Sequence, residues 1–314
     1  MRAIVVERTG GVRFVLGEVA ESEPAPHEAV VRVEAVSLNP GEVRMATATA
    51  PDGASIGADF AGVVERAAAN GAGPAVGARV FGISKTGAWR ERVAVPVGAL
   101  AALPAGVPAT VGAALPVAGM TALVALSEGG LLLGKRVLVN GASGGVGHLA
   151  VQLASRAGAF VVAAVRREAH VDAARQDGAD AVVVTETLEE ARPAGPFDVV
   201  LDSVGGVALG HALTMLTDGG VCVTYGNSSH ETATFNPMAF FHPRSNARFV
   251  GFFLWPVLDR QPASGLLERL ARLADSGALR PRSELVAPWE DVTEVVDRFV
   301  RRELTGKVVL TTGA

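Results

Sequence analysis

The sequence predicts an α/β protein made of two domains. Its 314 residues exceed the roughly 100–200 residues of an average domain, which favours two cores over one. Up to about Gly112 the chain consists of short β-rich runs between turns, with strands expected at Ala3–Val6, Val30–Val36, Ala61–Val64, Arg79–Phe81 and Arg92–Val95. From about Ala113 strands alternate with helices, a pattern typical of βαβ units on a parallel sheet.

The second domain is expected to hold a doubly wound parallel six-stranded sheet. Its strands are placed at Arg136–Asn140, Phe160–Val165, Ala181–Val184, Asp198–Asp202, Val221–Tyr225 and Arg248–Leu254. Helices are expected between them at Gly145–Ala157, Ala169–Gln176 and Val207–Leu216. Because six strands complete such a sheet, the tail elements Leu266–Leu273, Asp291–Val300 and Lys307–Leu310 are expected to return to the first domain. The expected domains are therefore residues 1–112 with 260–314, and residues 113–259.

Composition and charge exclude several classes of protein. Hydrophobic residues make up 49% of the chain and charged residues 19%, which suits compact folded domains rather than disorder. The net charge is −4 and basic residues form only pairs such as Arg166-Arg167, so no nucleic-acid partner is expected. With one cysteine, Cys222, the chain cannot form an internal disulfide or a multi-thiolate zinc site.

One uncharged stretch, Val97–Leu126, is long enough to span a membrane. Its prolines and glycines would break a helix, however, and a buried segment between domains is the better interpretation. The first residues run into charged positions without an apolar signal segment. We therefore expect a cytoplasmic protein with no membrane partner.

The sharpest motif is a glycine-rich turn between an expected strand and an expected helix. It reads Gly141-Ala142-Ser143-Gly144-Gly145-Val146-Gly147. Glycines allow the backbone to approach a pyrophosphate and the helix to pack closely on the strand, while the helix start offers free N–H groups and a positive dipole end. Strand, turn and helix in this order predict a dinucleotide site.

The end of the next strand bears on which dinucleotide binds. An acidic residue about 20 residues beyond the glycines would bind a ribose 2′-hydroxyl, but this chain has Arg166-Arg167 there. Two guanidinium groups suit a 2′-phosphate, although both could be solvated surface residues. The residues favour NADPH as the cofactor.

Further motifs lie along nearly the whole chain, at residues 36–43, 57–64, 113–122, 197–206 and 306–310. Together with the glycine turn they resemble the zinc-independent quinone oxidoreductase branch of the medium-chain dehydrogenase/reductase superfamily. The resemblance implies a GroES-like β domain formed by both ends of the chain, a Rossmann domain in the middle, and a substrate cleft between the two.

The resemblance also implies chemistry without a metal. In zinc-dependent members a metal-binding Cys stands where this chain has Asn39, and a His-Glu pair stands where it has Ala58-Asp59. By the same analogy Asn39 and Thr121 would lie near the nicotinamide, and Gly226 and Asn227 would border its ring. Asn39-Pro40 could equally be a plain turn.

The expected function is transfer of hydride from NADPH to a quinone or an α,β-unsaturated carbonyl compound, with a natural-product pathway as a specialised version. The alternative is a low-turnover NADPH-binding sensor or structural protein on the same fold. Asn39 is the favoured hydrogen-bond donor to the substrate oxygen. Tyr225, the only tyrosine, is the other catalytic candidate, but strand alternation could turn its ring into the domain.

A homodimer is expected as well. Arg248–Leu254 would be the edge strand of the six-stranded sheet, and it carries the apolar run Phe249–Trp255. An exposed apolar edge strand promotes aggregation unless a partner covers it.

Overall fold

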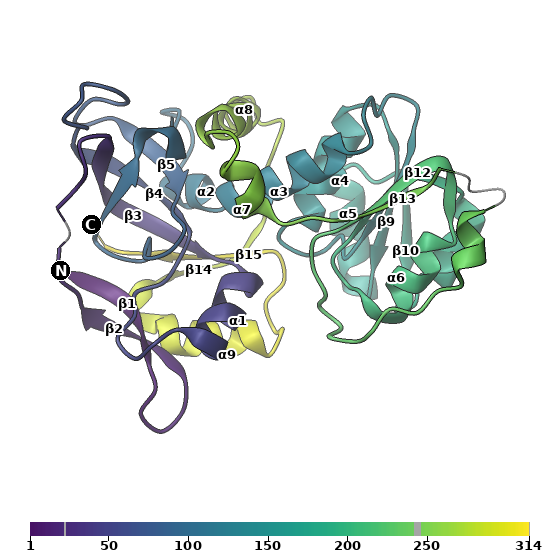
Figure 1. Ribbon diagram of the computed structural model, residues 1–314, viewed down its shortest axis with the longest axis horizontal. Helices are drawn as coiled ribbons and strands as arrows, with labels where there is room; N and C mark the ends of the chain where they lie inside the picture. The colour runs from purple at the N-terminus through teal and green to yellow at the C-terminus, as the bar shows by residue number, and fades with distance from the viewer. Residues whose placement is uncertain (22, 242–245, 314) are drawn as a thin grey trace. The chain divides into compact units, whose positions relative to one another are not determined.

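The computed structural model describes residues 1–21, 23–241 and 246–313, which form two compact units. Unit 1 comprises Met1–Met120 and the chain from Trp255 onward, and unit 2 comprises Thr121–Leu254 (Figure 1). The first division therefore falls eight residues after the expected position. The intervening segment packs on unit 1, since a Cβ on Gly119 would lie 2.8 Å from Leu270 Cδ1 and the Val117 N–H donates to Asp59.

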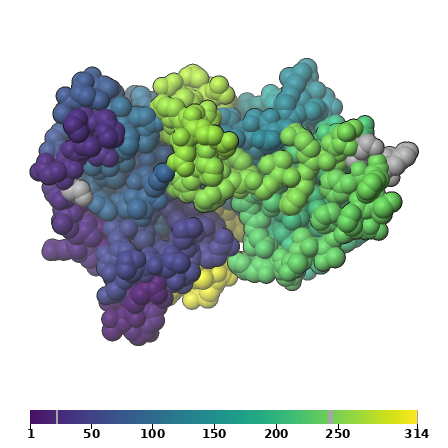
Figure 2. All heavy atoms as spheres, viewed as in Figure 1, coloured from purple at the N-terminus to yellow at the C-terminus, as the bar shows by residue number. Residues whose placement is uncertain are grey.

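Unit 1 is built on a seven-stranded sheet that contains the last strand of the chain. Its order is β14 (Ser283–Pro288), β15 (Lys307–Thr311), β3 (Glu28–Leu38), β4 (Asp59–Arg66), β5 (Arg79–Ile83) and β7 (Leu100–Ala102), and β6 (Arg92–Pro96) also pairs with β3. A separate hairpin pairs β1 (Arg2–Glu7) with β2 (Arg13–Glu18). Since β15 pairs antiparallel with β3, the tail does return to the first unit, and Figure 2 shows C-terminal atoms (yellow) beside N-terminal ones (purple).

The helices of unit 1 cover this sheet and include both expected tail helices. They are α1 (Pro40–Thr49), α2 (Ala109–Ala113), the first residues of α3 (Pro116–Ser127), most of α7 (Leu254–Leu258), α8 (Ser264–Asp275) and α9 (Val292–Val300). α8 and α9 are amphipathic and bury one face each, with Leu266, Leu267 and Leu270 on α8 and Val292, Val295 and Val296 on α9.

The uncharged stretch folds into short elements: the single-turn helix η1 (Val97–Ala99), β7, α2 and most of α3. In the described parts of the chain no helix is long and apolar enough to cross a membrane.

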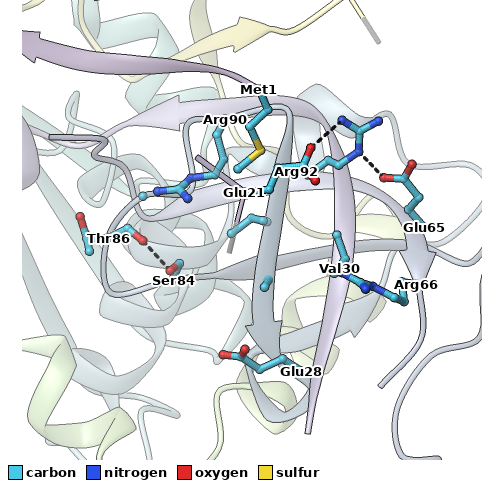
Figure 3. Close-up of a pocket in the computed structure, with 13 residues that line it drawn as sticks. Met1, Glu21, Glu28, Val30, Glu65, Arg66, Ser84, Thr86, Arg90 and Arg92 are labelled. Atoms are coloured by element: carbon cyan, nitrogen blue, oxygen red, sulfur yellow. Dashed lines mark hydrogen bonds and ion pairs between the residues drawn. The ribbon is translucent and has the colours of Figure 1, made fainter. Parts of the chain in front are cut away.

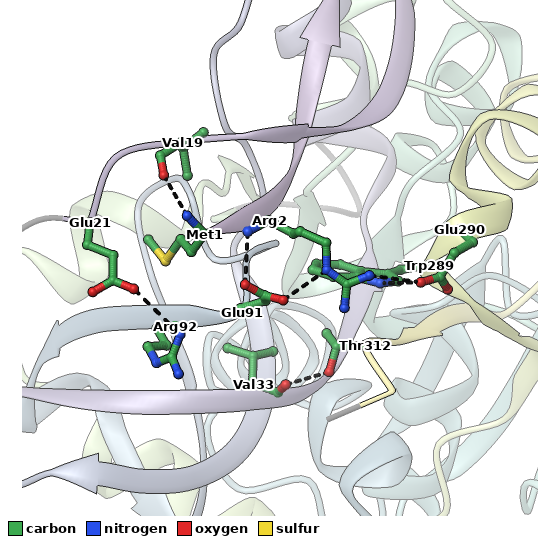
Figure 4. Close-up of polar contacts among 10 residues, drawn as sticks. All are labelled: Met1, Arg2, Val19, Glu21, Val33, Glu91, Arg92, Trp289, Glu290 and Thr312. Atoms are coloured by element: carbon green, nitrogen blue, oxygen red, sulfur yellow. Dashed lines mark hydrogen bonds and ion pairs between the residues drawn. The ribbon is translucent and has the colours of Figure 1, made fainter.

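A polar network joins the two ends of the chain within unit 1 (Figure 4). The Arg2 guanidinium lies 5.1 Å from the centre of the Trp289 ring, and its Nε donates to Glu91 at 2.9 Å. Trp289, on the short helix η5 (Trp289–Asp291), is fully buried and donates from its indole nitrogen to Glu290. The first strand is thereby fixed to the C-terminal segment.

Unit 2 is a doubly wound α/β sheet of six parallel strands, as predicted. The order is β10 (Ala181–Val184), β9 (Phe160–Val165), β8 (Arg136–Asn140), β11 (Phe197–Asp202), β12 (Leu216–Thr224) and β13 (Arg248–Gly251). The main helices are α4 (Gly147–Arg156), α5 (Val171–Gln176) and α6 (Gly206–Leu213). Short helices η2 (Glu168–His170), η3 (Glu189–Ala194) and η4 (Pro237–Phe240) complete the connections.

The edge strand is shorter than expected. The predicted strand Arg248–Leu254 was wrong in its last three residues, because β13 ends at Gly251 and α7 begins at Leu254. Pro256 lies in the first turn of α7, where the missing proline N–H costs no hydrogen bond. Of the predicted run, only Arg248–Gly251 therefore forms part of the sheet edge.

Trp289 is expected to be a main stabiliser of unit 1. Trp289→Ala should lower the free energy of unfolding by about 3–5 kcal/mol, because it removes a fully buried aromatic side chain. Arg2→Ala serves as the control and should cost less, since its side chain is 50% exposed. Urea titrations followed by circular dichroism measure both, and a larger loss in Arg2→Ala would contradict this ranking.

Candidate active site

The glycine turn lies between β8 and α4, at the carboxyl end of the sheet. A Cβ on Gly147 would lie 2.2 Å from the Gly141 carbonyl oxygen, so only glycine allows α4 to start this close to the turn. Gly141 itself has a φ of +82°, which favours glycine. No acceptor in the described chain takes the N–H groups of Gly145 and Val146, and no side chain caps α4. The turn therefore fits an anionic group such as a pyrophosphate.

The turn lies where the strand order reverses. β8 has β9 on one side and β11 on the other, so the loops after β8 and β11 leave the sheet at its switch point. Ser203, directly after β11, donates from Oγ to the Asn140 carbonyl at 3.1 Å. Ser203 belongs to the motif at residues 197–206, but sequence reasoning gave it no role.

A buried carboxylate connects three of the loops at this edge. Asp202 accepts hydrogen bonds from Asn140 Nδ2 at 2.7 Å, the Gly205 N–H at 3.0 Å and Thr224 Oγ1 at 3.4 Å. Burial raises the pKa of Asp202, and these hydrogen bonds partly oppose that rise. Asp202 holds the carboxyl ends of β8, β11 and β12 in register.

The loop after β12 carries three of the predicted residues. Gly226 lies against the Ser203 backbone, and the Asn227 side chain lies over Gly205, where a Cβ would be 2.1 Å from Asn227 Oδ1. Tyr225 has a buried hydroxyl group, and burial raises its pKa further above its ordinary value. A phenol that holds its proton so strongly is a poor proton donor near neutral pH.

The other predicted residues of unit 2 are placed as follows. Ala142, Ser143, Gly144, Gly145 and Val146 form the turn between Gly141 and Gly147. Arg166 and Arg167 follow β9 directly, are exposed, and make no ion pair within the described residues. Thr121 lies on α3 and is only 6% exposed.

Asn39 lies in unit 1 and belongs to a buried polar cluster. Its amide nitrogen donates to Asp59 Oδ2 at 2.8 Å and to Glu42 Oε1 at 3.1 Å, while its amide oxygen accepts from Lys307 Nζ at 2.7 Å. Ser37 Oγ also donates to Asp59, at 3.2 Å. Both amide hydrogens of Asn39 are thus already donated, so a substrate oxygen could receive one only if an existing bond breaks.

Glu42, the N3 residue of α1, has an unusual proton affinity. Its Oε1 accepts from the Asn39 N–H at 2.8 Å, whereas its buried Oε2 has no partner among the described residues. Burial, with a smaller contribution from the negative charge of Asp59, raises the pKa of Glu42 to about 8, and the Lys307 ammonium opposes the rise. Glu42 is therefore mostly protonated at neutral pH.

A cavity of about 640 Å³ opens elsewhere on unit 1 (Figure 3). Arg90 and Arg92 line it together with Glu21 and Glu65, and Arg92 pairs with both acids. Arg90 Nε is buried without a partner in the described chain, and burial lowers the pKa of this guanidinium. None of the residues predicted for the site lies in this cavity.

Two sequence families match most of the two units. Residues 25–105 match the alcohol dehydrogenase GroES-like domain, and residues 145–271 match a family described as zinc-binding dehydrogenase. The chain belongs to the medium-chain dehydrogenase/reductase superfamily. It is of the quinone oxidoreductase type within that superfamily, which makes it an oxidoreductase with a nicotinamide cofactor.

Two further proteins resemble the chain along most of its length. The human synaptic vesicle membrane protein VAT-1 homolog is 27% identical, covering all of this chain and 87% of that protein. The spectinabilin polyketide synthase system protein NorB of Streptomyces orinoci is 35% identical over 91% of this chain, which corresponds to 13% of that much longer protein.

Two solved structures share the fold at 25% identity. One is a quinone oxidoreductase of Pseudomonas syringae pv. Tomato DC3000, with a TM-score of 0.86, covering 99% of this chain and all of that one. The other is 2-haloacrylate reductase, with a TM-score of 0.84 and full coverage of both chains.

The raised pKa of Glu42 predicts a pH dependence of stability. In the unfolded chain Glu42 ionises near pH 4.5, but in the folded chain only near pH 8. The folded state therefore binds more protons than the unfolded state between these pH values. The stability that comes from the Glu42 proton is lost as the pH rises from about 4.5 to about 8.

Glu42→Gln should flatten this loss, because an amide does not ionise and its oxygen can still accept from Asn39. The measurement is the free energy of unfolding from pH 5 to 9. Glu268→Gln, an exposed position on α8, is the control and should keep the wild-type slope. Equal slopes in wild type and Glu42→Gln would contradict the assignment.

Proposed function

We propose that this oxidoreductase uses NADPH to reduce a conjugated carbonyl compound, either a quinone or an α,β-unsaturated carbonyl, without a metal ion. The observation that carries the proposal is the glycine turn at the switch point of the sheet, followed by two unpaired arginines after the next strand. Similarity to a quinone oxidoreductase and to 2-haloacrylate reductase supports this substrate class, since quinones and 2-haloacrylates are both electrophilic conjugated compounds.

The chain's own groups would bind and orient the reactants. The free N–H groups of Gly145 and Val146 would hold a pyrophosphate, and Arg166 and Arg167 would bind a 2′-phosphate. When bound, the nicotinamide supplies the hydride. Thr121, Gly226 and Asn227 are proposed to border the nicotinamide, as the family resemblance implies.

We propose different roles for Asn39 and Tyr225. Asn39 would act through its fixed orientation in the buried cluster, because both of its amide hydrogens already have acceptors. Tyr225 would act as a packing residue because its hydroxyl is buried and hard to deprotonate.

A natural-product pathway is the specialised form of this proposal. The similarity to part of a polyketide synthase system protein supports it, because that relative is 35% identical over 91% of this chain. The substrate would then be an enoyl group rather than a free quinone.

The test is consumption of NADPH, followed by its absorbance, with a panel of quinones, enals, enones and enoyl thioesters. We expect turnover with at least one class, and the class identifies the acceptor. If NADPH binds tightly and no acceptor is reduced, the protein is a nucleotide-binding sensor or structural protein instead.

Arg166 and Arg167 should determine the choice of cofactor. We expect NADPH to bind at least about tenfold more tightly than NADH, because charge-assisted hydrogen bonds contribute roughly 1.5–3 kcal/mol. Arg166→Ala with Arg167→Asp should remove most of this preference, whereas Arg156→Ala, an exposed arginine on α4, should leave it unchanged. Isothermal titration measures the dissociation constants, and equal wild-type values for both cofactors would refute the proposal.

We also propose a homodimer through the β13 edges of two chains. β13 ends the six-stranded sheet, and Phe249 on this strand and Phe253 just after it are 47% and 58% exposed. Light scattering at micromolar concentration should give twice the mass of 32.1 kDa. Phe249→Lys should produce monomers and Val300→Lys, an exposed valine on α9, should not. A monomeric wild type would contradict the proposal.

A further inference from the structure

Lys307 places a positive charge in the interior of unit 1. The side chain is 2% exposed, and Nζ lies 2.7 Å from Asn39 Oδ1, 3.1 Å from the Leu38 carbonyl oxygen and 3.3 Å from Asp59 Oδ2. An ammonium group has three N–H donors, and each has one acceptor here. Lysine is almost never fully buried without such pairing, so these three oxygens form a complete binding site for a cation.

The ammonium also determines how the Asn39 amide is turned. The amide oxygen faces Lys307, so the amide nitrogen faces the carboxyl groups of Asp59 and Glu42. The reversed amide would place its NH₂ against the ammonium and its oxygen against a carboxylate. Both contacts would be repulsive in a buried site, where electrostatic interactions are strong.

These residues do not fit the zinc ion that the matched family's description implies. Structural and catalytic zinc is held by Cys sulfur, His nitrogen and carboxylate oxygen. The oxygens around Nζ are a backbone carbonyl, an amide and a single carboxylate, and the ammonium occupies the position between them. Such an all-oxygen set suits a hard or ammonium-like cation.

We propose that Lys307 is a tethered cation that fills a cation site made by residues 38, 39 and 59, and that it thereby positions the Asn39 amide. Lys307 is a positioning residue, because it acts through Asn39. The expected effect on turnover rests on the proposed function, whereas the expected effect on cation binding does not. Removing the side chain should therefore open the site to a free ammonium ion.

The experiment compares two variants of the full-length protein. Lys307→Ala removes the charge and leaves space, whereas Lys307→Met removes the charge and fills the space. Melting temperature and NADPH turnover are measured in ammonium chloride and in choline chloride at equal ionic strength, because choline is too large to enter. Wild type and Lys85→Met, an exposed lysine in the same unit, are the controls.

In choline chloride, we expect the turnover of Lys307→Ala to be about tenfold below that of the wild type. Ammonium chloride should raise this turnover at least about threefold and should raise the melting temperature by at least about 3 °C over choline chloride. Lys307→Met, wild type and Lys85→Met should show no difference between the two salts. An identical response of the Ala and Met variants would overturn the proposal. If the wild type reduces no acceptor, the proposed function fails, but the melting temperatures still decide the cation site.

A further variant covers the case in which neither single variant folds. Lys307→Met leaves the Asp59 carboxylate buried and unpaired, whereas Asp59→Asn with Lys307→Met removes both charges. The double variant should therefore fold and melt higher than Lys307→Met. A double variant that is no more stable than Lys307→Met would show that Lys307 does not act as the counterion of Asp59, and the proposal would fail.

Discussion

The ion pair of Lys307 with Asp59, shared with Asn39, is the constraint on which unit 1 depends. It joins the start of the last strand to the end of β3 and the start of β4, across 248 residues of sequence. The second oxygen of Asp59 accepts from the Val117 N–H, which fixes the start of α3 to the same point. Removing one member of a buried pair costs about 3–5 kcal/mol because the other charge stays buried. This interaction therefore supports both the pairing of the C-terminal strand with β3 and the orientation of Asn39.

Unit 2 uses a buried carboxylate in a similar way, without a cation. Asp202 binds Asn140, Thr224 and the Gly205 N–H, so the loops after β8, β11 and β12 share one acceptor group. The glycine turn is thereby held on a rigid edge, which is what precise positioning of a cofactor requires. In each unit an aspartate that ends or begins a strand fixes the polar loops, and the apolar strands supply the stability behind it.

Much of the fold could be predicted because its signals are local. β8, β9 and β10 have the predicted bounds, since each is a short valine-containing apolar run that stops before a non-apolar residue: Gly141 after β8, Arg166 after β9 and Thr185 after β10. β7, at Leu100–Ala102, has neither alternation nor β-branched residues, and its pairing with β5 decides its structure. The glycine turn was likewise predictable, but the surroundings of Asn39 were not, because Lys307 is 268 residues away. Glu42, three residues after Asn39, was a local signal of a capping interaction that would occupy the asparagine.

The central claim is that the chain catalyses hydride transfer to a conjugated acceptor. The most direct measurement uses NADPH deuterated at the transferred position of the nicotinamide ring, with product analysed by mass spectrometry and NMR. With an α,β-unsaturated carbonyl as the acceptor, our account predicts one deuterium on the β carbon of the saturated product, from one face of the nicotinamide only, in enzyme treated with a chelator. Saturated product without deuterium, or labelled product only after zinc is added, would contradict it.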